Sequence, residues 1–243
     1  MKVNEVRSRL RELGNEEHAK GLQRFFKTGP GQYGEGDIFI GIRVPEMRKV
    51  LKECRDLPAM EALPLLRSPI HEERLLALLI FVRDFGKGDE STRRQIYDLY
   101  LGNRKYINNW DLVDLSAPNI VGMFLAERDK TPLYELAESE VLWDRRIAVL
   151  ATFYFIKCGE FSTSFEITEM LLADKEDLIH KATGWMLREI GKREEGAEKA
   201  FLNKHCRVMP RTMLRYAIER FPEPERRMYL KGTVDLRESV HAS

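Results

Sequence analysis

The 243-residue sequence has few of the residues that form disulfide frameworks or metal centres. It contains only three cysteines and five histidines, and both types are scattered along the chain. Three separated cysteines cannot form a disulfide framework, and neither residue type recurs at the short spacings of zinc sites. His205 and Cys206 are adjacent, but no further ligand accompanies them. Metal chemistry and thiol chemistry are therefore disfavoured.

Long apolar runs and strand patterns are also scarce. The longest apolar run, Leu75–Val82, is far too short to span a bilayer. No apolar segment of a signal peptide follows Met1–Glu5, so we expect a soluble, cytoplasmic protein. Charged residues make up 33% of the chain, and Leu, Glu, Arg and Ala are abundant, which favours helices. The best strand candidate, Asp37–Ile42, is short.

Motifs of nucleotide-binding enzymes and of serine hydrolases are missing. The chain has neither a Walker loop nor a Gly-x-Ser-x-Gly elbow. Gly29, Gly31 and Gly34 do match the letters of a dinucleotide-binding loop. Such a loop needs a buried strand before it and a helix at its end, and neither is predicted here. We therefore interpret this segment as a surface loop.

Helical segments recur at nearly constant intervals. Five of them open on a charged residue, continue with an apolar stretch, and begin 37, 35, 35 and 30 residues apart. The openings are Arg74, Asp111, Arg146, Lys181 and Arg211. Second helical stretches lie between them at Ser91–Leu101, Pro132–Glu138, Phe165–Ala173 and Glu194–Asn203. This period predicts an all-α fold, an α-solenoid of HEAT-like repeats, with the opening helices along its concave face.

The N-terminal part follows this period less well. Amphipathic helices are predicted at Val3–Leu13, Glu16–Lys27 and Pro45–Glu53. We therefore predict one domain over residues 1–231, with divergent helices in 1–70 and repeats in 71–231. Residues 232–243 are mostly polar and are expected to form a flexible tail.

Charge is unevenly distributed although the net charge is only +1. Residues 199–231 hold nine Lys or Arg against three Glu, whereas residues 1–198 hold 30 basic against 34 acidic residues. A basic segment permits a partner that carries phosphates. Composition alone favours an ordinary solvated helix face.

One acidic residue interrupts an otherwise apolar row of the repeat. The position three residues after each opening holds Ala77, Asp114, Val149, Gly184 and Leu214. A carboxylate in a packing position must meet a cation, hydrogen bonds or a cleft. Asp114 could form a salt bridge with Arg146, or it could face a groove and stabilise positive charge on a substrate. The pattern leaves both interpretations open.

Two tryptophans accompany this acid. Trp110 lies four residues before Asp114, so the two share one helix face, and Trp185 occurs in a later opening helix. Single tryptophans at helical spacing most often belong to the core. Two indoles beside an acid would instead make an aromatic cleft for a cation. Neighbouring arginines could then contact phosphates; they are Arg146, Arg188, Arg211 and Arg215.

Four segments in the same order resemble the DNA alkylation repair glycosylases with HEAT-like repeats, the AlkD family. They are Phe39–Arg48, Trp110–Asp114, Trp143–Leu150 and Lys181–Glu189. The resemblance covers roughly residues 5–225 and implies a monomeric solenoid that grips duplex DNA. It also implies excision of N3- and N7-alkylated purines without a metal or cofactor.

The resemblance assigns roles to particular residues. It implies that Asp114 is the catalytic carboxylate and that Trp110 and Trp185 line the lesion cleft. Arg146 is expected beside them near the DNA backbone, and the further residues expected to face DNA are Arg188, Arg48 and Lys52. Phe25 falls where some relatives have a tyrosine.

The implied chemistry needs few groups. Alkylation at N3 or N7 makes the purine cationic and a good leaving group, and the departing base leaves an oxocarbenium-like sugar. A fixed carboxylate stabilises that charge and can orient water. The family is thought not to flip the base into a reading pocket, so neutral lesions should be poor substrates. The alternative is a non-catalytic scaffold that binds a protein partner or structured DNA.

Overall fold

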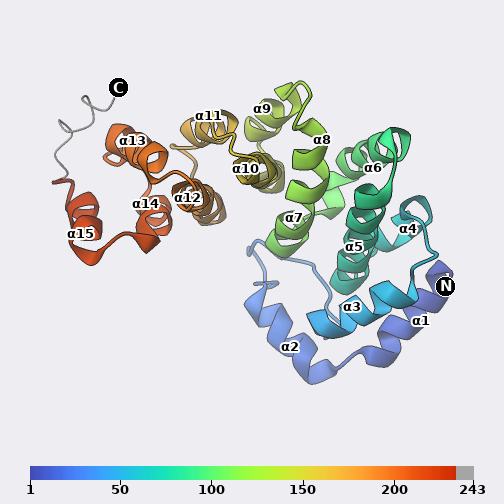
Figure 1. Ribbon diagram of the computed structural model, residues 1–243. Helices are drawn as coiled ribbons and strands as arrows, with labels where there is room; N and C mark the ends of the chain where they lie inside the picture. Colours follow the sequence, from blue (N-terminus) through green and yellow to red (C-terminus); the bar gives the residue numbers. More distant parts are fainter. Residues whose placement is uncertain (234–243) are drawn as a thin grey trace. The chain divides into compact units, whose positions relative to one another are not determined.

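The computed structural model describes residues 1–233, and this part of the chain consists of helices joined by turns and loops (Figure 1). Residues up to Phe124 form one compact unit, and the described residues from Leu125 to Thr233 form a second. The single domain expected over 1–231 stays a prediction. Of the expected tail, residues 234–243 lie outside the described residues. None of the helices up to residue 233 is long and apolar enough to cross a membrane.

Unit 1 is arranged around one long, largely buried helix, α5 (His71–Lys87), which packs against α1, α3, α4, α6 and α7. The bounds of the other elements are α1 (Val3–Leu13), α2 (Glu16–Phe25), α3 (Val44–Glu53), α4 (Ala59–Leu66), α6 (Glu90–Gly102), the short 3₁₀ helix η1 (Arg104–Tyr106), α7 (Trp110–Ala117) and the π turn η2 (Pro118–Gly122). α8 (Met123–Leu125) falls at the boundary of the units. Helix α2 differs from the other long helices of the unit because none of its residues is buried.

Unit 2 continues with helix pairs. Its helices α10 (Leu142–Lys157) and α12 (Asp177–Gly191) pack against each other, and α12 packs against α14 (Arg211–Ala217). The remaining elements are α9 (Thr131–Ala137), α11 (Ser162–Met170), α13 (Glu195–His205), the short 3₁₀ helix η3 (Ile218–Arg220) and α15 (Glu223–Lys231). The second helical stretches expected between the openings are thus present as α6, α9, α11 and α13, which confirms the all-helical repeat.

The apolar row of the repeat is confirmed as a packing row. Ala77, Val149, Gly184 and Leu214 are all buried, whereas Asp114 is partly exposed. Gly184 shows why a small residue is needed in α12. A Cβ there would lie 2.4 Å from the carbonyl oxygen of Met213, so only glycine permits the close approach of α14.

The best strand candidate of the sequence, Asp37–Ile42, does not form a strand. Within residues 1–233 only one isolated parallel bridge occurs in this region, between Ile38 and Ile70. The Glu72 carboxylate accepts hydrogen bonds from the backbone N–H groups of Ile40, Gly41 and Ile42 at 2.8–3.3 Å, so no neighbouring strand receives them. Gly41 has φ +85°, and a Cβ there would lie 2.0 Å from the Asn15 carbonyl oxygen. The apolar segment is therefore a loop that ties α2 to α5.

Candidate active site

The predicted acid and one predicted indole lie on α7 in unit 1. Asn109 caps this helix: it is fully buried, and its Oδ1 accepts the backbone N–H of Trp110 at 2.8 Å. Trp110 and Asp114 follow, one turn apart, and both side chains are partly exposed. The capped helix therefore presents an indole and a carboxylate on one face, as the spacing predicts.

An aromatic column supports Trp110 from inside the unit. Its ring stacks on Phe26 with centroids 5.1 Å apart and planes inclined by 18°. Phe26 stacks in the same way on Phe39 at 5.0 Å, and Phe39 stacks on His71 at 4.4 Å. Phe25 meets Trp110 edge-on at 5.9 Å and is 63% exposed. Aromatic packing of this kind leaves Trp110 little freedom to rotate.

His71, at the inner end of this column, joins two carboxylates. Its Nε2 lies 2.8 Å from Oδ2 of Asp111, and its Nδ1 lies 3.3 Å from Oδ2 of Asp37. Burial alone would lower the pKa of His71, but the hydrogen bonds to Asp111 and Asp37 raise it above its usual value. Burial alone would likewise raise the pKa of Asp37, yet His71 and the nearby charge of Arg74 lower it.

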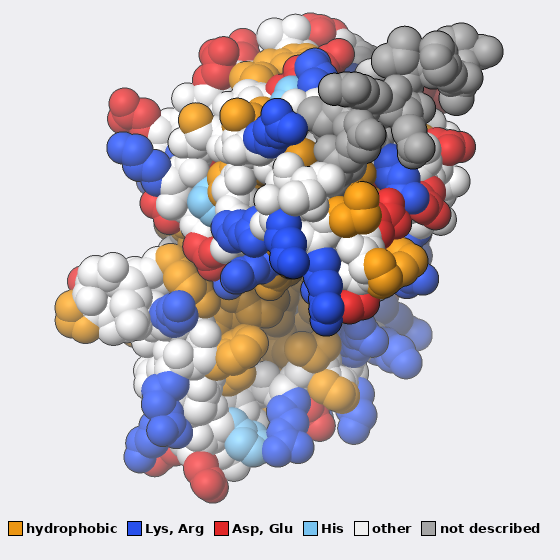
Figure 2. Space-filling model, turned by 90° about the vertical axis from the view of Figure 1, so that its left-hand side faces the viewer, with side chains coloured by type: hydrophobic (Ala, Val, Ile, Leu, Met, Phe, Trp, Pro, Cys, Tyr) orange, Lys and Arg blue, Asp and Glu red, His pale blue; other side chains and the backbone are white. Residues whose placement is uncertain are grey.

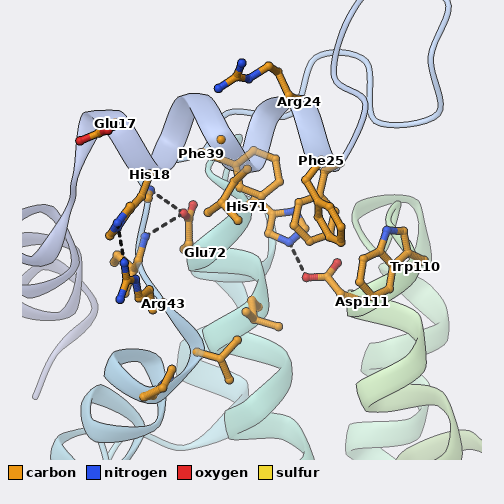
Figure 3. A pocket seen from close by; sticks show the side chains of 18 residues that line it. Glu17, His18, Arg24, Phe25, Phe39, Arg43, His71, Glu72, Trp110 and Asp111 are labelled. Atoms are coloured by element: carbon orange, nitrogen blue, oxygen red, sulfur yellow. Dashed lines mark hydrogen bonds and ion pairs between the residues drawn. The ribbon is translucent and has the colours of Figure 1, made fainter.

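A pocket of about 830 Å³ opens beneath α2 in unit 1, beside this column. In Figure 3, Phe25, Asp111 and Trp110 lie at one end of it, and His18 and Arg43 lie at the other. Its walls are mostly apolar. Three of its polar side chains form hydrogen bonds within the protein: His71 with Asp111, Glu72 with backbone N–H groups, and His18 with Arg43 at 2.7 Å. Glu17, which also lines the pocket, is exposed.

The second predicted indole lies on α12 in unit 2. Trp185 is partly exposed; its Nε1 donates to Oε1 of Glu189 at 3.1 Å, and its ring contacts Phe153 at 5.7 Å. Glu189 also pairs with Lys192 and Arg193. Burial would raise the pKa of Glu189, but the hydrogen bonds from Lys192 and Trp185 lower it overall. The ionised carboxylate of Glu189 therefore accepts the indole N–H of Trp185.

The predicted DNA-binding cations differ in exposure. Arg146, on α10, is only 5% exposed, and its Nη1 donates to the carbonyl oxygen of Leu178 at the start of α12. Arg188 forms an ion pair with Glu219. The exposed ones are Arg48 and Lys52 on α3 and Arg211 and Arg215 on α14. Figure 2 shows Lys and Arg side chains spread over the displayed face. Of the six predicted cations, these four are therefore the ones whose side chains are most accessible to a ligand.

Sequence reasoning missed the cluster behind Trp110. Asp37, His71 and Asp111 are separated by 34 and 40 residues, and no local pattern connects them. The adjacency of Asp111 to Trp110 was the one available signal. Among residues 1–233, no group of three or more His, Cys, Asp or Glu could hold a metal ion.

Comparison with known proteins agrees with this architecture. A predicted DNA alkylation repair enzyme from Enterococcus faecalis has a similar fold, with a TM-score of 0.66 and 18% sequence identity over 86% of this chain and 97% of that one. No curated protein matches the sequence. The family model for DNA alkylation repair enzymes matches residues 6–221, nearly the whole chain. The chain therefore belongs to the DNA alkylation repair enzyme family.

Proposed function

We propose that this protein is a DNA glycosylase that excises cationic N3- and N7-alkylated purines from duplex DNA. Membership of the DNA alkylation repair enzyme family supports a role in the repair of alkylated DNA. The observation that carries the finer proposal is Asp114. It is a partly exposed carboxylate in a row whose other members are buried and apolar or small, and it lies one turn from a partly exposed indole.

The proposed reaction is hydrolysis of the N-glycosidic bond. The bond between the deoxyribose C1′ and the purine nitrogen breaks, and its electron pair neutralises the cationic base. Asp114 stabilises the positive charge that develops on the sugar and orients a water molecule, which forms the new bond to C1′ and loses a proton. Trp110 supplies aromatic surface for the cationic sugar. The family resemblance gives Trp185 the same role. No protonation of the leaving base is needed.

The pocket beside Trp110 fits a mechanism without base reading. The walls are mostly apolar, and His18, His71 and Glu72 in the lining already form hydrogen bonds within the protein, so few polar groups remain to bind the edge of a flipped base. Selectivity then comes from the weakened glycosidic bond of a cationic purine. Neutral lesions should react slowly.

The cations needed for duplex binding are proposed to come from both units. Arg48 and Lys52 in unit 1 and Arg211 and Arg215 in unit 2 are exposed and can neutralise phosphates. Arg188 could join them if DNA displaces Glu219 from its guanidinium. For the buried Arg146 we propose that it chiefly secures α12, which carries Trp185.

The test is the identity of the base released from duplex DNA. Methylated duplex should yield free 7-methylguanine and 3-methyladenine together with abasic sites, whereas duplex carrying a neutral lesion such as hypoxanthine should yield almost none. Absence of any released base, with a folded protein that still binds duplex DNA, would instead favour the non-catalytic scaffold.

A further inference from the structure

We propose that His71 is a positioning residue for excision: as an imidazolium clamped between Asp37 and Asp111, it fixes the first turn of α7 and with it Trp110. This inference rests on the proposed glycosylase function. His71 itself offers almost no surface to a substrate, because its side chain is only 2% exposed.

The hydrogen bonds themselves require the charged form of His71. Each ring nitrogen faces a carboxylate oxygen, at 2.8 Å for Asp111 and 3.3 Å for Asp37. Ionised carboxylates only accept hydrogen bonds, so both nitrogens must donate, and only the imidazolium carries two N–H groups. A neutral imidazole would leave one carboxylate without its donor.

The charges around His71 balance only when its ring is a protonated imidazolium. The Asp37 carboxylate also accepts hydrogen bonds from Nη2 of Arg74 at 2.6 Å and from Nδ2 of Asn109 at 3.1 Å. Two carboxylates, Asp37 and Asp111, thus face two cations, Arg74 and His71. Glu72, the adjacent carboxylate on α5, is occupied by the backbone N–H groups of the loop before α3. Loss of the His71 proton would leave a net charge of −1 in a buried cluster, which is costly.

Two paths connect His71 to Trp110. The first path is through the backbone of α7. Asp111 directly follows Trp110 in the first turn of this helix, and Asp37 accepts a hydrogen bond from Asn109, which caps it. The second path is the column of stacked rings from His71 through Phe39 and Phe26 to the indole. His71 therefore holds both the backbone and the ring of Trp110, and Asp114 lies one turn further along.

A consequence follows for the pH dependence of excision. As the pH rises through the raised pKa of His71, the clamp loses one charge-assisted hydrogen bond and α7 loosens at its start. The excision step should then slow, by about tenfold if one such bond is lost from the transition state. Binding should change little, because the proposed phosphate contacts lie on other helices, Arg48 and Lys52 on α3 and Arg211 and Arg215 on α14.

The experiment is the single-turnover excision rate of 7-methylguanine duplex for wild type and His71→Gln, between about pH 6 and 9. The wild-type rate should fall with rising pH, and the variant should be slow and nearly independent of pH. Ionisation of the substrate affects both proteins alike. His205→Gln is the matched control, since His205 pairs with Glu169 in unit 2, and it should keep the wild-type profile. A His71→Gln variant with the wild-type rate and profile would overturn the proposal.

A second measurement needs neither catalysis nor a variant at His71. The imidazole of His71 should titrate above 6.5 in an NMR pH series, and the fluorescence of Trp110, assigned by difference from Trp110→Phe, should change at the same pH. Titration at or below 6.5, or Trp110 emission indifferent to it, would overturn the proposal. If the protein released no base at any pH, the glycosylase proposal would fail while this titration still tested the clamp.

Discussion

The indole of Trp110 stacks on the ring of Phe26, with centroids 5.1 Å apart and planes inclined by 18°. This stacking restricts the orientation of the indole although the side chain is partly exposed to solvent. Phe26 is in turn buried against Phe39, so the orientation of a proposed active-site residue depends on core packing.

Replacing Phe26 by leucine should therefore affect catalysis more than binding. Phe26→Leu removes the stacking surface and should cost about 1–2 kcal/mol of stability. We expect excision to slow by about tenfold because Trp110 gains rotational freedom. Phe85→Leu, at a buried position of α5 outside the column, should cost similar stability without changing excision. Equal losses of excision in both variants would show a general effect of destabilisation.

The contribution of Trp185 to excision should come from the face of its aromatic ring more than from its indole N–H. Trp185→Phe keeps an aromatic face beside Phe153, and we expect excision within a few-fold of wild type. Trp185→Ala removes that face and should slow single-turnover excision by about tenfold or more. The proposed cation-stabilising role would be wrong if the alanine variant excised at the wild-type rate.

Arg48 and Lys52 should set part of the salt dependence of duplex binding. Each phosphate contact that is lost should reduce the slope of log K against log salt by about 0.9. We expect Arg48→Ala and Lys52→Ala to weaken binding at low salt and to flatten this slope in a titration series. Lys87→Ala, at an exposed lysine at the end of α5, serves as the control and should leave the slope unchanged.

Glu198 on α13 should make unit 2 less stable as the pH rises. Burial, with a smaller contribution from the charge of Glu195, raises the pKa of Glu198 to about 8 from 4.5. The unfolded chain releases this proton near its ordinary pKa, whereas the folded protein retains it to about pH 8, so stability falls across that interval. The expected loss is up to about 4 kcal/mol.

Glu198→Gln should remove this dependence. The variant should match wild type near pH 4.5 and unfold at a higher temperature at pH 8, as followed by circular dichroism. The same pH dependence in both proteins would show that another group is responsible.

The sequence predicted the helical repeat because periodic apolar positions report directly on packing. The openings at Arg74, Arg146 and Lys181 lie within long helices with many buried residues, α5, α10 and α12. α15 escaped detection because it is highly charged and only Tyr229 is buried in it. α4 contains Pro64, which ordinarily argues against a helix interior.

The candidate site was only partly predictable. Trp110 and Asp114 share a helix face, which spacing alone reveals. His71 reaches that helix from the start of α5, and Asp37 reaches it from the loop that precedes α3, and no local pattern encodes such long-range contacts. The hydrogen bonds from the backbone of this loop to Glu72 explain why Asp37–Ile42 is a loop although its composition suggests a strand.

The central claim is that Asp114 stabilises the developing cation. Its most direct test is the single-turnover release of 7-methylguanine from a defined duplex by wild type and Asp114→Asn, with duplex affinity measured in parallel. Asp98→Asn, at an exposed position of α6, is the control for loss of a surface charge. The account predicts excision by wild type and Asp98→Asn, and none by Asp114→Asn despite equal or tighter binding. Excision by Asp114→Asn at the wild-type rate would contradict it.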